Sequence, residues 1–136
     1  MANLNYATKE LNLKIVYYGA SLGGKTTNIR SIYARLGHDH KGKMMSLATD
    51  LDQTIFFDFL PVDVGEVKGW KLRFHLYTVP GQVYYNASRR LVLRNVDGLV
   101  FVVDSQQERL DENIESMYNL RDNLKSYDLA LEAIPT

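Results

Sequence analysis

The 136-residue sequence contains no cysteine, so it offers neither a disulfide bond nor a cysteine-ligated metal. It has no apolar run long enough to cross a membrane, and residues 1–6 lack the basic-then-apolar pattern of a signal peptide. Lysine plus arginine and aspartate plus glutamate both number 16, so no net charge indicates a nucleic acid or membrane partner. We therefore expect a soluble cytoplasmic protein whose function depends on a local site.

A phosphate-binding motif is the strongest feature that is present. The pattern Gly-x-x-x-x-Gly-Lys-[Ser/Thr] is matched by Gly19-Ala20-Ser21-Leu22-Gly23-Gly24-Lys25-Thr26. A β-prone run at 13–18 precedes it, and apolar residues at helical spacing follow it, namely Ile29, Ile32, Tyr33 and Leu36. An ordinary glycine-rich turn is the alternative, but a strand before the motif and a helix after it favour the phosphate loop.

The chemistry of such a loop assigns roles to individual residues. Successive backbone N–H groups and the positive end of the helix dipole meet the phosphate oxygens, and the glycines leave room for that approach. The motif places Lys25 on the β- and γ-phosphates and the hydroxyl of Thr26 on Mg²⁺. The sequence therefore predicts a nucleotide site at the end of the first strand.

Downstream patterns predict an α/β fold. The polar stretch 37–50 is typical of a mobile loop, and its His38-x-His40 pair lacks partners with metal-ligand spacing. The β-prone runs 54–60 and 71–77 predict an antiparallel hairpin whose turn contains Gly65 and Gly69.

Two helices and a strand complete the predicted order. A short basic helix at 84–95 carries Arg89, Arg90 and Arg94. The all-apolar segment 98–103 predicts a strand buried on both faces of a parallel sheet. A helix at 110–127 has an apolar stripe, which we assign to core packing, at Ile114, Met117, Leu120 and Leu124.

These elements predict one layered sheet, mostly parallel with one antiparallel hairpin, and helices on both faces. We expect residues 1–136 to form a single nucleotide-binding domain that is incomplete at its C-terminal end.

Specific runs resemble the Ras-like small GTPases, and most closely the bacterial gliding and polarity GTPase family MglA. The resemblance covers essentially the whole chain, and the residues that carry it are 14–19, 56–61, 65–69 and the run Phe74-His75-Leu76-Tyr77-Thr78-Val79-Pro80-Gly81-Gln82. It implies a P-loop NTPase fold and a GTP/GDP switch that depends on Mg²⁺.

The resemblance also implies site residues. Residues Gly19 to Thr27 and Gly81 would hold the nucleotide, Thr54 would sense the γ-phosphate and bind Mg²⁺, and Gln82 would orient the attacking water. Lys25 would neutralise charge during catalysis. Implied partners are an MglB-like Roadblock-type activating protein and downstream motility effectors. The implied protein is monomeric by itself, binds no nucleic acid, and is concentrated at a cell pole through partners.

Four departures from the small-GTPase pattern bear on activity. Thr78 stands where an Mg²⁺-associated aspartate is usual, so that Asp58 or Asp52 would supply the charge; MglA-like sequences share this threonine. Ser21 replaces a glycine beside the γ-phosphate, and Gln53 stands where MglA-like proteins tend to have a catalytic arginine. The guanine-reading Asn-Lys-x-Asp motif is absent from the 136 residues.

These departures leave alternatives open. One is a pseudo-GTPase scaffold that binds nucleotide or a partner with negligible hydrolysis. A metabolic phosphate-loop kinase is disfavoured by the hairpin and by the Pro80–Gln82 run.

Overall fold

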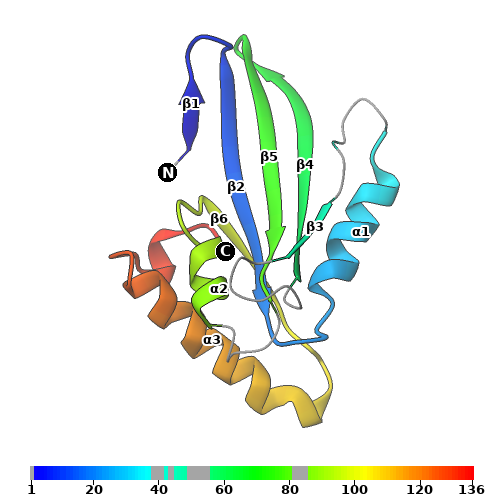
Figure 1. Ribbon diagram of the computed structural model, residues 1–136, viewed down its shortest axis with the longest axis vertical. Coiled ribbons are helices and arrows are strands. Elements are labelled where there is room, and N and C mark those ends of the chain that lie inside the picture. Colours follow the sequence, from blue (N-terminus) through cyan, green and yellow to red (C-terminus); the bar gives the residue numbers. More distant parts are fainter. Residues whose placement is uncertain (1, 38–41, 43–44, 49–55, 81–85) are drawn as a thin grey trace.

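A six-stranded sheet flanked by helices forms the described part of the computed structural model, which comprises residues 2–37, 42, 45–48, 56–80 and 86–136 (Figure 1). The strands are β1 (Asn3–Asn5), β2 (Glu10–Gly19), β3 (Met45–Ala48), β4 (Phe56–Val67), β5 (Trp70–Thr78) and β6 (Gly98–Val102). The helices are α1 (Lys25–Arg35), α2 (Asn86–Val92) and α3 (Leu110–Lys125), with short 3₁₀ turns η2 (Gln107–Arg109) and η3 (Leu131–Ala133).

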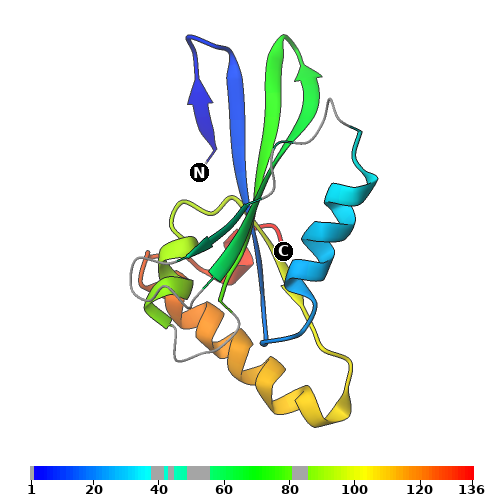
Figure 2. The same ribbon diagram turned by 45° about the vertical axis from the view of Figure 1, so that its right-hand side comes forward.

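Strand β2 is the centre of the sheet because neighbours pair with both of its edges. One edge pairs in parallel with β5, while the other is shared by antiparallel β1 and parallel β6. Alternate side chains of β2 are buried on opposite faces. Val16 and Tyr18 pack with α2 and α3, whereas Tyr17 packs with Ile29 of α1. Helices therefore cover both faces, as predicted (Figure 2).

The predicted hairpin is confirmed, with one change at its turn. Strands β4 and β5 pair antiparallel from Phe59↔Tyr77 to Val67↔Trp70. The turn is formed by Lys68 and Gly69, whereas Gly65 lies in an irregularity within β4, where its N–H bonds the Asp63 carboxylate.

The prediction of a mostly parallel sheet is wrong, because the described sheet is mixed. Antiparallel pairing joins β1 to β2, β3 to β4 and β4 to β5. Residues 45–48 form β3, although the sequence predicts a loop over 37–50. Both extra strands are short edge strands held by backbone pairing, so hydrophobic alternation gives little signal for them.

Two predicted apolar faces also need correction. Val100 of β6 is 37% exposed and Val103 is 60% exposed, since β6 lies at an edge of the described sheet. On α3, Leu120 and Leu124 are buried as predicted, but Ile114 is 47% exposed. The buried face instead includes three polar residues, Asn113, Ser116 and Asn123. None of the helices in the described ranges combines the length and apolarity needed to span a bilayer.

Candidate functional site

The connection between β2 and α1 has the geometry of a phosphate loop. Strand β2 ends at Gly19 and helix α1 begins at Lys25, so Ala20–Gly24 turn the chain at the helix N-terminus. The first turn of α1 includes Thr27, whose side chain is exposed, and no acidic residue. Free backbone N–H groups and the helix dipole therefore favour an anion at this end of α1.

Glycine is required at two positions of the loop. Gly19 has φ +146°, and a Cβ there would lie 2.3 Å from the carbonyl oxygen of Val102 in β6. Gly24, at the N-cap of α1, has φ +103°. Leu22 also has positive φ, at 57°, and its side chain is 93% exposed. The tip of the loop is therefore open to a ligand, while its base is pressed against β6.

Lys25 is buried beside the loop that it is predicted to serve. Its side chain is 6% exposed, and Nζ donates hydrogen bonds to the carbonyls of Gly19 at 3.0 Å and Ala20 at 2.6 Å. Burial, together with the positive charges of Arg89 and Arg109, lowers the pKa of Lys25 to about 8. The ammonium is thus placed at the loop in an environment where positive charge outweighs negative charge.

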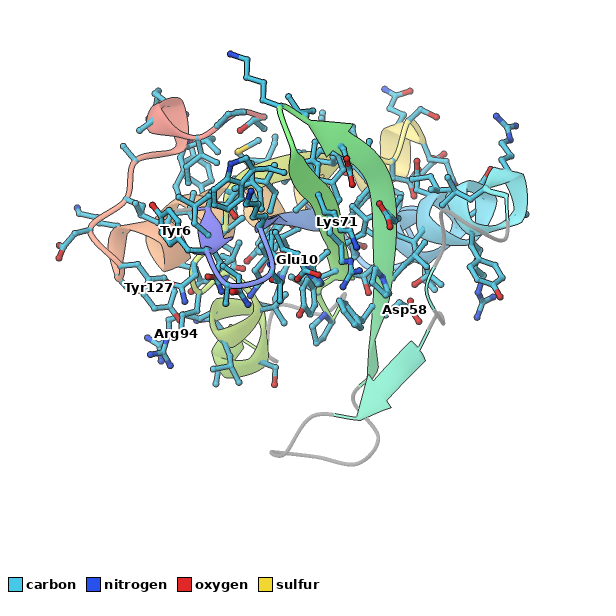
Figure 3. The ribbon with its side chains drawn as sticks, turned by 90° about the horizontal axis from the view of Figure 1, so that it is seen from above. Tyr6, Glu10, Asp58, Lys71, Arg94 and Tyr127 are labelled. Carbon is cyan, nitrogen blue, oxygen red and sulfur yellow. The ribbon has the colours of Figure 1, made fainter. Side chains whose placement is uncertain are left out.

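A chain of oxygen-bearing side chains lies next to Lys25. The Thr26 hydroxyl donates to the Asp58 carboxylate at 2.5 Å, and the Asp58 N–H donates to the Thr78 hydroxyl at 2.7 Å. Asp58 belongs to β4, and in Figure 3 it lies on the side of that strand where α1 is found. Of the two carboxylates considered from the sequence, Asp58 is therefore placed at the loop, while Asp52 lies outside the described residues.

These oxygens fit a magnesium ion. Mg²⁺ prefers hard oxygen ligands and is bound by one or two carboxylates together with substrate phosphates. Thr26 and Asp58 supply a hydroxyl and a carboxylate side by side. Over the described ranges, His, Asp and Glu side chains form no group of three suited to a metal.

Some of the predicted site residues, namely Gln53, Thr54, Gly81 and Gln82, lie outside the described residues, as does the His38-x-His40 pair for which no metal site is predicted. Ser21 is described, and its backbone carbonyl accepts a hydrogen bond from Nη2 of Arg109. The predicted roles of Thr54 in γ-phosphate sensing and of Gln82 in water activation stay predictions.

The sequence pattern misplaces one arginine. It groups Arg89 with Arg90 and Arg94 as the charges of one basic helix, but the Arg89 side chain is fully buried. Arg90 and Arg94 are exposed, and Arg94 lies at the periphery in Figure 3. The missed signal is spacing, because Arg89 lies three and four residues before the buried pair Val92 and Leu93.

A cavity of about 310 Å³ opens at the loop, and a larger one of about 630 Å³ lies between β1, β2 and β5. The smaller cavity is lined by Leu22, Gly23, Gly24, Lys25, Thr26, Thr27, Thr78 and Val79. We assign the functional site to the smaller cavity because the helix N-terminus, the Lys25 ammonium and the Thr26 hydroxyl meet there.

Comparison with known proteins decides the family. No family model matches the chain. The Mutual gliding-motility protein MglA of Myxococcus xanthus (strain DK1622) is 56% identical over 135 residues, which are 99% of this chain and 69% of that protein. The chain belongs to the MglA family of small GTPases. The resemblance inferred from the sequence is thereby confirmed, and the phosphate loop belongs to a GTPase family.

The MglA-type loop should not tolerate a side chain at Gly19. We expect Gly19→Ala to lower the free energy of unfolding by roughly 2–4 kcal/mol, because strain at positive φ adds to a backbone collision. Gly69→Ala is the matched control, since Gly69 has φ +82° but no atom within 4 Å of the position that a Cβ would take. Its cost should be about 1 kcal/mol. Guanidinium denaturation measures both, and equal losses would contradict the close packing of Gly19 against β6.

Proposed function

We propose that this protein is a GTP/GDP molecular switch that binds guanine nucleotide through residues 19–27 and hydrolyses GTP. The observation that carries the proposal is the grouping of a buried Lys25 and the Thr26–Asp58 pair at the N-terminus of α1 in a member of a GTPase family. Phosphoryl transfer depends on positioning and charge neutralisation, which these groups supply.

Phosphate binding would replace hydrogen bonds that Lys25 makes with carbonyl groups of its own loop. The hydrogen bonds from Lys25 Nζ to the Gly19 and Ala20 carbonyls hold the ammonium in place before the ligand arrives. Anionic phosphate oxygens are stronger acceptors for an ammonium than neutral carbonyls, so Lys25 would turn toward them. The loop N–H groups would donate hydrogen bonds to the remaining phosphate oxygens. Gly81, which follows β5 in the sequence, would also contact the nucleotide.

In this proposal the Thr26 hydroxyl and Thr54 bind Mg²⁺, and Asp58 supplies the carboxylate that Thr78 cannot. Held by these residues, Mg²⁺ would supply positive charge against the negative charge that develops on the phosphates. The contact of Asp58 with both Thr26 and the Thr78 hydroxyl supports this assignment.

Hydrolysis would require the segment from 81 to 85. Gln82 orients the attacking water, and Thr54 and Gln82 respond to the γ-phosphate, so that GTP orders their loops and hydrolysis releases them. Gln53 cannot place a full positive charge on the transition state, and Ser21 adds a side chain near the γ-phosphate. We therefore propose a slow intrinsic rate. These two residues also support the second candidate, a pseudo-GTPase scaffold.

The biological role is proposed by analogy with MglA, whose name concerns gliding motility. We propose a cytoplasmic regulator of bacterial motility or polarity that is monomeric by itself and reaches a cell pole through partners. An MglB-like Roadblock-type activator and motility effectors are the proposed partners. Their contact surface would include exposed Arg90 and Arg94, without the buried Arg89.

Nucleotide binding should depend on Lys25 and on its proton. We expect Lys25→Ala to weaken GDP affinity at least about a hundredfold, because a buried charge-assisted contact is lost. The pKa of about 8 in the free protein rises when phosphate binds, so affinity stays constant below about pH 7. Above a pH of about 8 it should fall by up to about tenfold per pH unit as the lysine loses its proton.

Fluorescence titration of the full-length protein with GDP, from about pH 6.5 to about pH 9, measures both effects across the pKa of Lys25. The Lys25→Ala variant is the control, since it should lack the steep fall at alkaline pH. An affinity for GDP that is unchanged in this variant would refute the proposed binding site.

Single-turnover GTP hydrolysis separates a switch from a scaffold. We expect slow hydrolysis that accelerates with an MglB-like partner, and a further gain in the Ser21→Gly, Gln53→Arg double variant. An arginine placed on a transition state contributes ~10³–10⁵ in rate, so a well-positioned Gln53→Arg should dominate the gain. No hydrolysis in any variant, with or without partner, would favour the scaffold.

A further inference from the structure

Arg89 is buried in contact with Gly19, the first residue of the phosphate loop. It belongs to α2, its side chain is 0% exposed, and its Nη2 donates to the Gly19 carbonyl at 3.2 Å and to Ser116 Oγ at 2.9 Å. The guanidinium carbon lies 4.3 Å from the centroid of the Tyr18 ring. The Gly19 carbonyl thus accepts hydrogen bonds from two cations, Arg89 and Lys25.

The charge on Arg89 has no ion-pair partner among the described residues. Its Nε and Nη1 are buried there without any hydrogen-bond acceptor. Arg109, the other arginine at the loop, differs because Asp104 and Glu112 lie 3.5 and 2.8 Å from its guanidinium. Burial is the main influence on the pKa of Arg89 and lowers it, while Tyr18 and the exposed Glu115 raise it.

Burying a guanidinium whose positive charge has no paired negative charge lowers the stability of the fold. Such a group is retained where its charge has another role, such as attracting an anion. Arg89 shares the Gly19 carbonyl with Lys25, and both of these residues belong to or touch the phosphate loop. The two positive charges oppose each other in the free protein, since Arg89 lowers the pKa of Lys25. A bound phosphate would bring negative charge close to both and relieve that repulsion.

We propose that Arg89 is a second cation of the phosphate site, which strengthens nucleotide binding through the Gly19 peptide without touching the phosphates. This inference rests on the proposed nucleotide-binding function. It makes Arg89 a positioning residue and links α2, the helix after the Gln82 segment, to the phosphate loop. Loading of the nucleotide then depends on where α2 lies.

Substitutions at Arg89 separate charge from packing. Arg89→Gln keeps an N–H donor for Gly19 or Ser116 but removes the charge, Arg89→Met removes both, and Arg89→Lys keeps the charge. Arg90→Met is the matched control, because it removes the same charge from an exposed position on the same helix. GDP titrations with the full-length protein at about pH 6.5 keep a buried lysine protonated.

We expect GDP affinity to fall about tenfold in both Arg89→Gln and Arg89→Met, as loss of a nearby charge in a partly shielded site implies. Arg89→Lys should stay within about threefold of the unaltered protein, and Arg90→Met within about twofold. The rise in melting temperature produced by GDP should shrink in the Gln and Met variants, even where the nucleotide-free protein is as stable as before.

The inference is overturned if Arg89→Gln binds GDP as tightly as the unaltered protein, because the charge would then have no role. It is also overturned if Arg89→Lys loses as much affinity as Arg89→Met. Lys25→Ala, titrated in parallel, distinguishes failure of the proposed nucleotide-binding function from failure of the inference about Arg89. If Lys25→Ala weakens binding while the Arg89 variants do not, the proposed function stands and this inference alone fails.

Discussion

The close approach of Gly19 to β6 is the constraint on which the site depends. A Cβ at Gly19 would collide with the Val102 carbonyl. The backbone at the end of β2 therefore packs directly against the backbone of β6, with no side chain between them. This position brings the Gly19 carbonyl within reach of Lys25 from one element and Arg89 from another. One peptide group thus connects the sheet, the phosphate loop and α2.

Two buried cations, Lys25 and Arg89, donate hydrogen bonds to this one peptide carbonyl. Arg109 contacts the neighbouring Ser21 carbonyl, but its charge is paired with Asp104 and Glu112. A bound anion would offset the repulsion between these cations, which is the behaviour expected of a phosphate-binding loop. Burial, together with the charges of Arg89 and Arg109, lowers the pKa of Lys25 to about 8, which is the measurable consequence of this arrangement.

Asp58 adds a carboxylate next to the loop, where it accepts a hydrogen bond from the Thr26 hydroxyl. The backbone N–H of Asp58 donates to the Thr78 hydroxyl in the neighbouring strand β5, and that hydroxyl lies 3.5 Å from the carboxylate. Thr78 therefore still contributes to the site. It carries no carboxylate itself, but it orients the Asp58 carboxylate on β4.

Local sequence patterns predict those parts of the site that depend on residue spacing. The loop and the helix after it follow from such spacing, as does the β4–β5 hairpin. The position of Arg89 depends on which face of a short helix meets α3, and the choice between Asp58 and Asp52 depends on strand register. Strands β1 and β3 escaped prediction because backbone pairing at an edge leaves little trace in the side chains.

A crystal structure of the full-length protein with GDP and Mg²⁺ tests the central claim most directly. The account predicts the β-phosphate within the loop 19–26, with Lys25 Nζ in contact with it and turned from the Ala20 carbonyl. It further predicts Mg²⁺ on the Thr26 hydroxyl, with Asp58 beside it. Phosphates bound elsewhere, such as in the larger cavity lined by Lys14 and His75, would contradict the account.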